Sequence, residues 1–264
     1  MPEFSVQPNP RIPFTVRHAD DDLMVVEKPG MVPTQPGKGH ARDTLLNGLF
    51  AAHGAALQNV GAARDWGLLH RLDRETSGLV LVALKPHVWD ELREEFARRR
   101  VSKRYWAIVE GAPAKATGVI RMGIEEVVGR QKTARVSSAG KEAVTAYRVL
   151  QSKGAHSLVE CKPGTGRLHQ IRVHMRAIGC PVLGDTMYGG GAARERTPRL
   201  ALHAWRLGFH HPATGSAMVV VAPLPDDLIG VCRRLGLRPP EPDAAPERIK
   251  PGFRPADSED IGTK

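Results

Sequence analysis

Apolar residues recur along the chain in short runs. Some runs are apolar throughout and others are apolar at every second position, which are the patterns of fully buried and half-buried strands. They predict strands at residues 14–17, 22–27, 79–84, 104–109, 144–150, 157–161, 200–206 and 217–222. The sequence therefore predicts a strand-rich protein.

Helical spacing of apolar residues separates some of these runs. It predicts helices at residues 43–52, after Pro86, at residues 167–178 and at residues 226–235. Asp43 is the expected N-cap of the first helix, and Val88, Leu92 and Phe96 recur every fourth residue in the second. Because strands and helices do not alternate regularly, we expect an α+β fold with a mixed, mostly antiparallel central sheet flanked by helices.

Both ends of the chain differ from the middle in composition. Residues 1–13 contain four prolines, and residues 237–264 are rich in Pro, Asp, Glu and Arg with few apolar residues. The 264 residues are enough to bury a sizeable core. We predict an irregular N-terminal tail at 1–13, one compact domain at 14–236 and a Pro-rich, flexible C-terminal tail at 237–264.

The charge balance favours an anionic partner. Lys and Arg number 38 against 28 Asp and Glu, a formal net charge of +10. Such a surface attracts a polyanion before any specific contact forms, and nucleic acid is the expected partner. A basic surface that only keeps the protein dissolved explains the charge equally well.

Cysteine usage and hydropathy indicate a compartment. The three cysteines are widely spaced and include no C-x-x-C pair, which argues against a disulfide framework and a structural zinc site. The N-terminus lacks the apolar region of a signal peptide, and no apolar run reaches the roughly 18 residues of a membrane span. We expect a soluble, cytoplasmic protein that does not interact with membranes.

Residues 70–78, with the sequence HRLDRETSG, place a carboxylate before an apolar run. Asp73 lies in the polar part of this stretch, and Gly78 precedes the predicted strand at 79–84. A loop at the mouth of a buried strand can hold a side chain firmly and still expose it to a substrate. A turn in which Asp73, Thr76 and Ser77 bind backbone amides explains the local chemistry as well.

The same nonapeptide resembles the HRLD-x-x-TSG signature of the RluA-type pseudouridine synthases. Further motifs that are similar to those of the family follow in the family's order, at residues 21–29, 103–111, 166–174, 181–188 and 202–204. The resemblance implies the pseudouridine synthase catalytic fold and an enzyme that isomerises specific uridines in structured RNA. It also implies that the RNA is ribosomal RNA, transfer RNA or both, and that Asp73 is the catalytic carboxylate.

Four other site residues follow from the resemblance. It implies that Arg172 pairs with Asp73, that Tyr105 stacks on the target base, that Arg71 enters the RNA helix where the nucleotide was, and that Leu202 lines the uracil pocket. From their own patterns, a solvated helix arginine and a core tyrosine are the default interpretations of Arg172 and Tyr105. A phosphate-neutralising or loop-bracing arginine explains Arg71 about as well as the family role, and a core leucine explains Leu202 nearly as well.

Helical geometry gives Arg172 a possible route to a cleft. On a helix starting near Arg167, the residues Leu168, Ile171, Met175 and Ile178 form one apolar stripe. Arg172 falls about 40° from Leu168 on such a helix, at the edge of the stripe. An arginine at that edge can reach a cleft while the helix packs.

The reaction requires little beyond the protein. Pseudouridine forms when the bond from uracil N1 to ribose C1′ breaks and uracil C5 joins the same carbon, so no atoms are gained or lost. The sequence contains neither a G-x-G-x-x-G fingerprint nor a Walker loop, and we expect no cofactor. An ionised carboxylate beside C1′ can act as nucleophile, as base at C2′ or as stabiliser of positive charge, and these three roles stay open.

The histidines invite a metal interpretation that we do not adopt. His169 and His174 are five residues apart, about 140° on a helix, whereas paired zinc ligands on a helix are four residues apart. Ordinary polar packing is the better interpretation of His169, His174, His203, His210 and His211. The basic run at residues 93–104 is consistent with a phosphate contact or with a solvated helix end.

The sequence departs from the family pattern in two places. Relatives often have a small RNA-binding domain before the catalytic domain, but only about a dozen residues precede the first predicted strand here. Leu168 replaces a threonine common in the family. We expect a monomer that recognises a short structured RNA element. The alternatives are a non-catalytic RNA-binding or RNA-folding protein that uses the same cleft, and a glycosidase, for which a lone carboxylate fits poorly.

Overall fold

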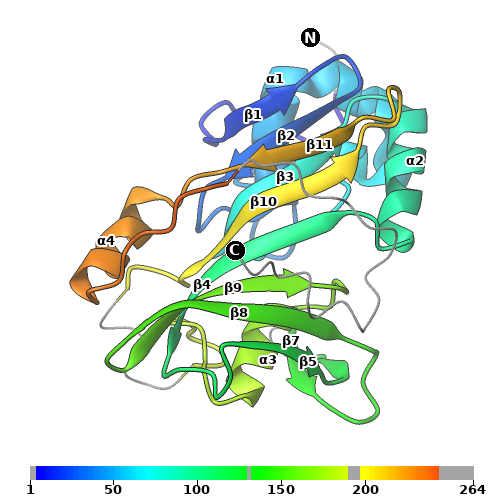
Figure 1. Ribbon diagram of the computed structural model, residues 1–264. Helices are drawn as coiled ribbons and strands as arrows, with labels where there is room; N and C mark the ends of the chain where they lie inside the picture. The colour runs from blue at the N-terminus through cyan, green and yellow to red at the C-terminus, as the bar shows by residue number, and fades with distance from the viewer. Residues whose placement is uncertain (1–3, 130–131, 190–196, 244–264) are drawn as a thin grey trace. The chain divides into compact units, whose positions relative to one another are not determined.

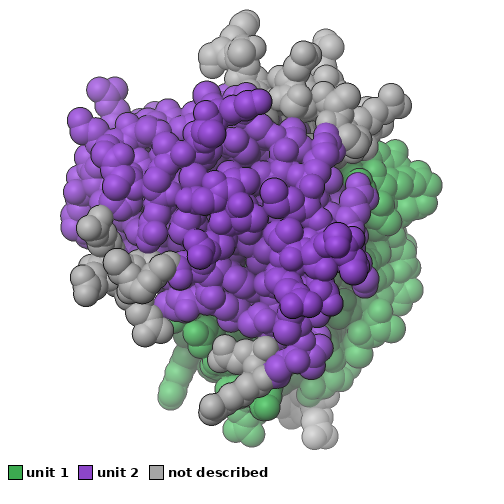
Figure 2. Space-filling model, turned by 90° about the horizontal axis from the view of Figure 1, so that it is seen from below, with its two compact units in different colours: residues 1–102, 204–222, 243–251 green, residues 103–203, 223–242, 252–264 purple. Residues whose placement is uncertain are grey.

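The computed structural model describes residues 4–129, 132–189 and 197–243 (Figure 1). The fold is α+β and its sheet is mostly antiparallel, as the sequence predicted. The chain forms two compact units, coloured separately in Figure 2. Among the described residues, unit 1 comprises 4–102, 204–222 and 243, and unit 2 comprises 103–129, 132–189, 197–203 and 223–242. The single domain predicted at residues 14–236 includes parts of both units and stays a prediction.

Unit 1 is built on a run of neighbouring strands. In order across the sheet they are β1 (Thr15–Ala19), β2 (Leu23–Lys28), β3 (Ser77–Ala83) and β10 (Leu202–His210, whose first two residues belong to unit 2), and β11 (Ala217–Val221) also pairs with β10. β2 is antiparallel to both β1 and β3, with Lys28 opposite Gly78. The continuous apolar runs of β2 and β3 are buried, and β3 is buried along its whole length.

Helices cover the core of unit 1. They are α1 (Leu45–Val60), the 3-10 helix η1 (Ala62–Gly67) and α2 (Pro86–Ala97). Pro86 occupies the first turn of α2, as predicted, and Val88 and Leu92 are fully buried against the sheet core. The cap of α1 is Thr44 rather than the predicted Asp43. Thr44 accepts the Asn47 amide and the Asn47 side chain accepts the Thr44 amide, so two otherwise unpaired helix-end amides are satisfied.

Unit 2 contains a second run of antiparallel strands. In order they are β4 (Ser102–Glu110, beginning one residue before the unit), β9 (His156–Pro163), β8 (Val144–Lys153) and β5 (Thr117–Arg121). A separate hairpin consists of β6 (Ile124–Val127) and β7 (Thr133–Val136), and the helices are α3 (Gln170–Ala177) and α4 (Asp226–Arg234). The strands β5, β6 and β7 were not predicted, because they are short and carry few buried residues.

The predicted start of the third helix was wrong. α3 begins at Gln170, because His169 has a left-handed backbone conformation with φ of 52° and cannot continue a right-handed helix. Leu168 therefore precedes the helix, and the helical angle from Leu168 to Arg172 does not apply. Arg172 lies at a buried position with 4% of its surface exposed, rather than at the edge of an apolar stripe.

The two predicted tails differ in what the structure describes. Residues 4–13 form no helix or strand, but they pack on α1: the rings of Phe4 and Phe50 lie 5.7 Å apart and the amide of Asn9 donates to the carbonyl of Asn47. Residues 237–243 also lack regular structure. The rest of the predicted C-terminal tail, residues 244–264, lies outside the described residues.

Candidate active site

Asp73 lies in a tight turn directly before β3. The backbone carbonyl of Asp73 accepts the amide of Thr76 at 3.1 Å, and β3 begins one residue later. The Asp73 side chain is half-buried, whereas its neighbour Leu72 and Thr76 are buried. The turn thus presents the Asp73 carboxylate, with Arg74 and Glu75, between two buried residues, as the sequence predicted for a loop at the mouth of a strand.

A buried lysine braces this turn. Lys28, at the end of β2, is fully buried, and its Nζ donates to the carbonyls of Pro29 at 2.9 Å, Val32 at 2.6 Å and Arg74 at 3.2 Å. A buried ammonium is costly unless its hydrogens are bonded, so these bonds tie residues 29–32 to the residue after Asp73. The sequence placed Lys28 in a family-like motif but assigned it no role.

Thr34 and Gly78 fix the turn from two further directions. The Thr34 hydroxyl donates to the Leu72 carbonyl at 2.8 Å and accepts the Leu72 amide at 3.1 Å. Gly78 has a φ of 121°, and a Cβ at that position would lie 2.3 Å from the carbonyl oxygen of Ala204 on β10. Only glycine permits this approach of β10 to the strand that follows the turn.

Arg71 occupies the same loop as Asp73. Its side chain is exposed, in contrast to the buried Leu72 between the two residues. The loop therefore offers a cation to solvent two residues before the candidate carboxylate.

The other predicted site residues belong to unit 2. Tyr105 lies on β4 opposite Cys161 and is 9% exposed, and Leu202, the first residue of β10, is 3% exposed. Trp106 follows Tyr105 on the strand, so the two rings leave β4 on opposite faces, as predicted. Tyr105 and Leu202 are thus both close to full burial.

Arg172 is held by a carboxylate that sequence reasoning missed. Its Nε donates to Oδ2 of Asp185 and its Nη2 to Oδ1, both at 2.8 Å, and its guanidinium carbon lies 5.0 Å from the centre of the Tyr188 ring. Asp185 lies in a family-like motif of the sequence, but no pattern in that motif indicates a partner 13 residues away. Asp73 and Arg172 belong to different units, and their pairing stays a prediction.

The electrostatics of the Arg172–Asp185 pair favour the ionised state. Burial acts to raise the pKa of Asp185, but the hydrogen bonds and charge of Arg172 outweigh it, with help from the amides of Tyr188 and Met187. The pKa of Asp185 therefore lies below its ordinary value. Both side chains of the pair are almost completely buried.

The predicted basic run is partly neutralised by nearby carboxylates. Arg98 pairs with Glu94 and Arg100 with Glu95. Further along, Arg104 and Glu160 form a buried pair. These contacts favour the helix-end interpretation of the run over a dense phosphate surface.

Two of the histidines pack as ordinary polar residues. His169 binds the Tyr188 hydroxyl through Nδ1 at 2.7 Å. His174 contacts the Thr145 hydroxyl and the Met122 carbonyl, both at 2.9 Å, and burial lowers its pKa. Polar packing, the predicted role, accounts for both side chains.

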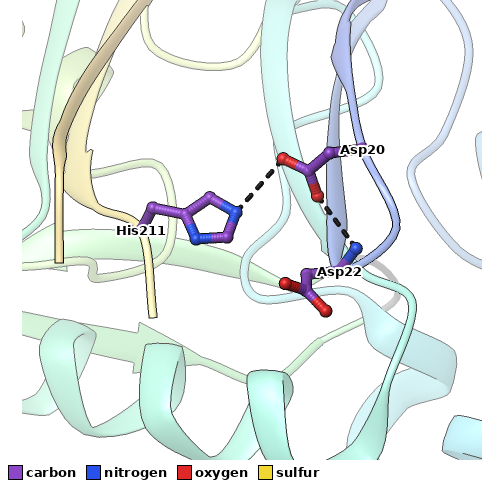
Figure 3. Close-up of side chains that lie close together, drawn as sticks. All are labelled: Asp20, Asp22 and His211. Carbon is purple, nitrogen blue, oxygen red and sulfur yellow. Dashed lines mark hydrogen bonds and ion pairs between the residues drawn. The ribbon is translucent and has the colours of Figure 1, made fainter. Parts of the chain in front are cut away.

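Within the described residues, one group has the side chains for a metal ion. It consists of Asp20, Asp22 and His211, whose ligand atoms lie within 4.8 Å of one another (Figure 3). Asp20 accepts the amides of Asp22 and Leu23 on one oxygen and faces His211 Nε2 at 3.1 Å with the other. Asp22 accepts Lys85 Nζ at 2.7 Å. These contacts explain the group as a brace of the β1–β2 turn.

Comparison with known proteins places this geometry in a family. A family model described as RNA pseudouridylate synthase matches residues 22–177. The chain belongs to this family. The match contains the Asp73 turn, Tyr105 and Arg172, and it confirms the expected RluA-type family, its fold and an enzyme that converts uridine to pseudouridine in RNA.

Individual relatives extend the match over most of the chain. A protein of Vibrio cholerae named ribosomal large subunit pseudouridine synthase D is 39% identical over 83% of this chain and 69% of its own length. The uncharacterized RNA pseudouridine synthase YlyB of Bacillus subtilis is 38% identical over 83% of this chain and 72% of its own length. The chain spans 66% of the length of a similar Synechocystis protein.

Solved structures agree with the fold. The human protein described as RNA pseudouridylate synthase domain containing 4 superposes with a TM-score of 0.68 at 28% identity, covering 86% of this chain and 95% of that protein. The human protein described as RNA pseudouridylate synthase domain containing 1 superposes with a TM-score of 0.66 at 27% identity and covers 90% of this chain. Among the described residues of this chain, the helices are all too short or too polar to cross a membrane.

Proposed function

We propose that this protein isomerises one or more uridines of large-subunit ribosomal RNA, with Asp73 as the ionised carboxylate at C1′ of a flipped nucleotide. The substrate class follows relatives that are named as ribosomal large subunit synthases. The observation that carries the proposal is the Asp73 turn, which presents a family-signature carboxylate on a backbone braced by Lys28 and Thr34.

The other residues receive roles that fit their positions. Arg71 is exposed and adjacent, and it fills the gap that the flipped nucleotide leaves in the RNA helix. Tyr105 stacks on the base and Leu202 lines the uracil pocket. Arg172 pairs with Asp73, the role that the family resemblance gives it.

The test is pseudouridine mapping of total RNA from a deletion strain complemented with wild type or Asp73→Asn. The substitution keeps size and hydrogen-bonding capacity but removes the charge, so we expect a loss of at least about 1,000-fold in rate. One or more ribosomal RNA sites should disappear on deletion, return with wild type and stay absent with Asp73→Asn.

Other patterns in the same maps exclude parts of the proposal. A site that returns with Asp73→Asn indicates action through RNA binding alone. If deletion removes a transfer RNA site and no ribosomal RNA site, the substrate class is transfer RNA and the proposed chemistry stands. Release of free uracil from purified enzyme and RNA indicates a glycosidase.

A further inference from the structure

Arg172 is oriented by its surroundings to an unusual degree for a side chain with four flexible bonds. Asp185 contacts the Nε and Nη2 edge of the guanidinium at 2.8 Å for each bond. A guanidinium is planar and has five N–H donors, so a carboxylate on this edge directs the other three N–H groups, one on Nη2 and two on Nη1, away from itself. Asp185 therefore fixes the direction in which Arg172 can donate to another anion.

The orientation of Asp185 is set by the backbone and not by Arg172. Its Oδ1 also accepts the amides of Met187 and Tyr188, both at 3.0 Å, and its side chain is fully buried. The preceding Gly184 has a φ of 77°, and a Cβ there would lie 2.4 Å from the Arg199 carbonyl oxygen. This turn is thus built for one conformation that glycine alone adopts without strain.

Tyr188 supports the guanidinium from one face. The guanidinium carbon lies 5.0 Å from the ring centre, within the range of a cation–π contact. The Tyr188 hydroxyl accepts the amide of Ala134 on β7 at 2.8 Å and contacts Nδ1 of His169 at 2.7 Å. The ring is therefore held at its far end by two separate segments of unit 2.

We propose that Asp185 and Tyr188 form an arginine seat, in which Asp185 is a positioning residue that sets the direction of Arg172 for the isomerisation. This inference rests on the proposed function, because it concerns the arginine assigned to Asp73. A pair kept only for stability needs neither two backbone amides on the carboxylate nor an anchored ring under the cation. The two amides on Asp185 and the anchored ring of Tyr188 all fix the direction of the guanidinium. Catalysis is sensitive to displacements of about 1 Å.

Asp185→Asn tests the seat. Asparagine can still accept the amides of Met187 and Tyr188, but it loses the charge and one of the two bonds to Arg172. We expect kcat on a ribosomal RNA fragment to fall about 10- to 100-fold with KM changed less than about threefold. Rates are measured at temperatures at which circular dichroism shows every variant folded.

The matched control is Asp90→Asn. Arg64 donates to Asp90 through Nε and Nη2 at 2.9 Å each, so the pair has the same side-on geometry, but it is exposed and lies between η1 and α2. We expect kcat and KM of this variant to equal those of wild type. An equal fall in both variants overturns the seat, because it marks a general effect of losing an Arg–Asp pair.

Tyr188→Phe gives a second test that leaves the ion pair intact. It keeps the ring under Arg172 and removes the bonds to Ala134 and His169, so kcat should fall about fivefold. If Asp185→Asn does not fold, this variant decides: wild-type kcat overturns the seat.

The outcomes separate the seat from the proposed function. If wild type forms pseudouridine, Asp73→Asn does not, and Asp185→Asn retains the wild-type kcat, the seat is wrong and the proposed function stands. If wild type forms none, or Asp73→Asn is active, the proposed function fails and the seat fails with it. A raised KM with unchanged kcat for Asp185→Asn also overturns the seat, because it assigns the pair to RNA binding.

Discussion

Two buried cations, Lys28 and Arg172, lie in motifs that resemble those of the family, and they are held by different chemistry. In unit 1, Lys28 donates to three backbone carbonyls and so joins the end of β2 to the turn of Asp73. In unit 2, Arg172 donates to the two oxygens of one carboxylate and lies over an aromatic ring. An ammonium is a point charge with three donors that can bind separate segments, whereas a guanidinium is a planar fork that suits one carboxylate.

The difference assigns the two cations different tasks. Carbonyl acceptors on three residues make Lys28 a tie between stretches of backbone, so its main contribution is to the stability of the turn. The Asp185 carboxylate on one edge of the guanidinium gives Arg172 a direction, so its main contribution is to geometry. Substitutions that remove one or the other should separate stability from catalysis.

The largest effect on stability should come from Lys28→Met. Methionine fills a similar volume but leaves the carbonyls of Pro29, Val32 and Arg74 without this donor in a buried place. We expect the free energy of unfolding to fall by about 3 to 5 kcal/mol, measured by urea titration. Lys85→Met is the control: Lys85 is 44% exposed in its pair with Asp22, and this variant should keep nearly the stability of wild type.

A loss below about 1 kcal/mol for Lys28→Met would contradict the role of Lys28 as a tie. If instead the variant keeps wild-type stability and only its kcat falls, Lys28 acts by positioning the Asp73 turn for catalysis and not by stabilising it. The comparison between the two cations then fails.

A smaller effect of the same kind is expected for Thr34→Val. The two side chains have nearly the same shape, but valine removes the hydroxyl that satisfies both the amide and the carbonyl of Leu72. The free energy of unfolding should fall by about 2 to 3 kcal/mol, because two buried backbone groups lose their partner. Thr214→Val, at an exposed hydroxyl bonded to the Ser216 amide, should change it by less than about 0.5 kcal/mol. Equal losses at both threonines would remove Thr34 from the support of the turn.

The elements that the sequence predicted well have strong local signals. β2 and β3 are continuous apolar runs, and α2 begins at a proline with buried Val88 and Leu92 one turn apart. These features depend on residues close together in the chain, so periodicity and turn chemistry reveal them. Asp73 was found in the same way, through a contiguous motif.

The features that were missed depend on which side chains and backbone groups meet in the fold. The choice of Thr44 over Asp43 as cap rests on the reciprocal bond with Asn47, since both residue types cap helices well. The late start of α3 rests on the left-handed backbone of His169, whose neighbour Tyr188 is 19 residues away. The Asp185 partner of Arg172 was hidden for the same reason, because a family-like motif shows which residues occur together and not which atoms meet.

Acid pH should distinguish the two cations by the acceptors that hold them. The pKa of Asp185 is lowered in the folded protein, so its contribution to stability is fully present above the unfolded carboxyl pKa of about 4. It is lost as the pH falls below that value through the folded pKa, since Arg172 then loses its ionised partner in wild type as it does in Asp185→Asn. The three backbone carbonyls that accept from Lys28 do not titrate. The stability gap between wild type and Asp185→Asn should therefore be constant from pH 7 to about pH 4.5 and shrink below pH 4 by up to about 1.4 kcal/mol per pH unit. The gap between wild type and Lys28→Met should keep its size over the same range. Urea titrations from pH 7 to pH 3 measure both gaps, and a constant gap for Asp185→Asn would mean that the charge of Asp185 contributes nothing to holding Arg172.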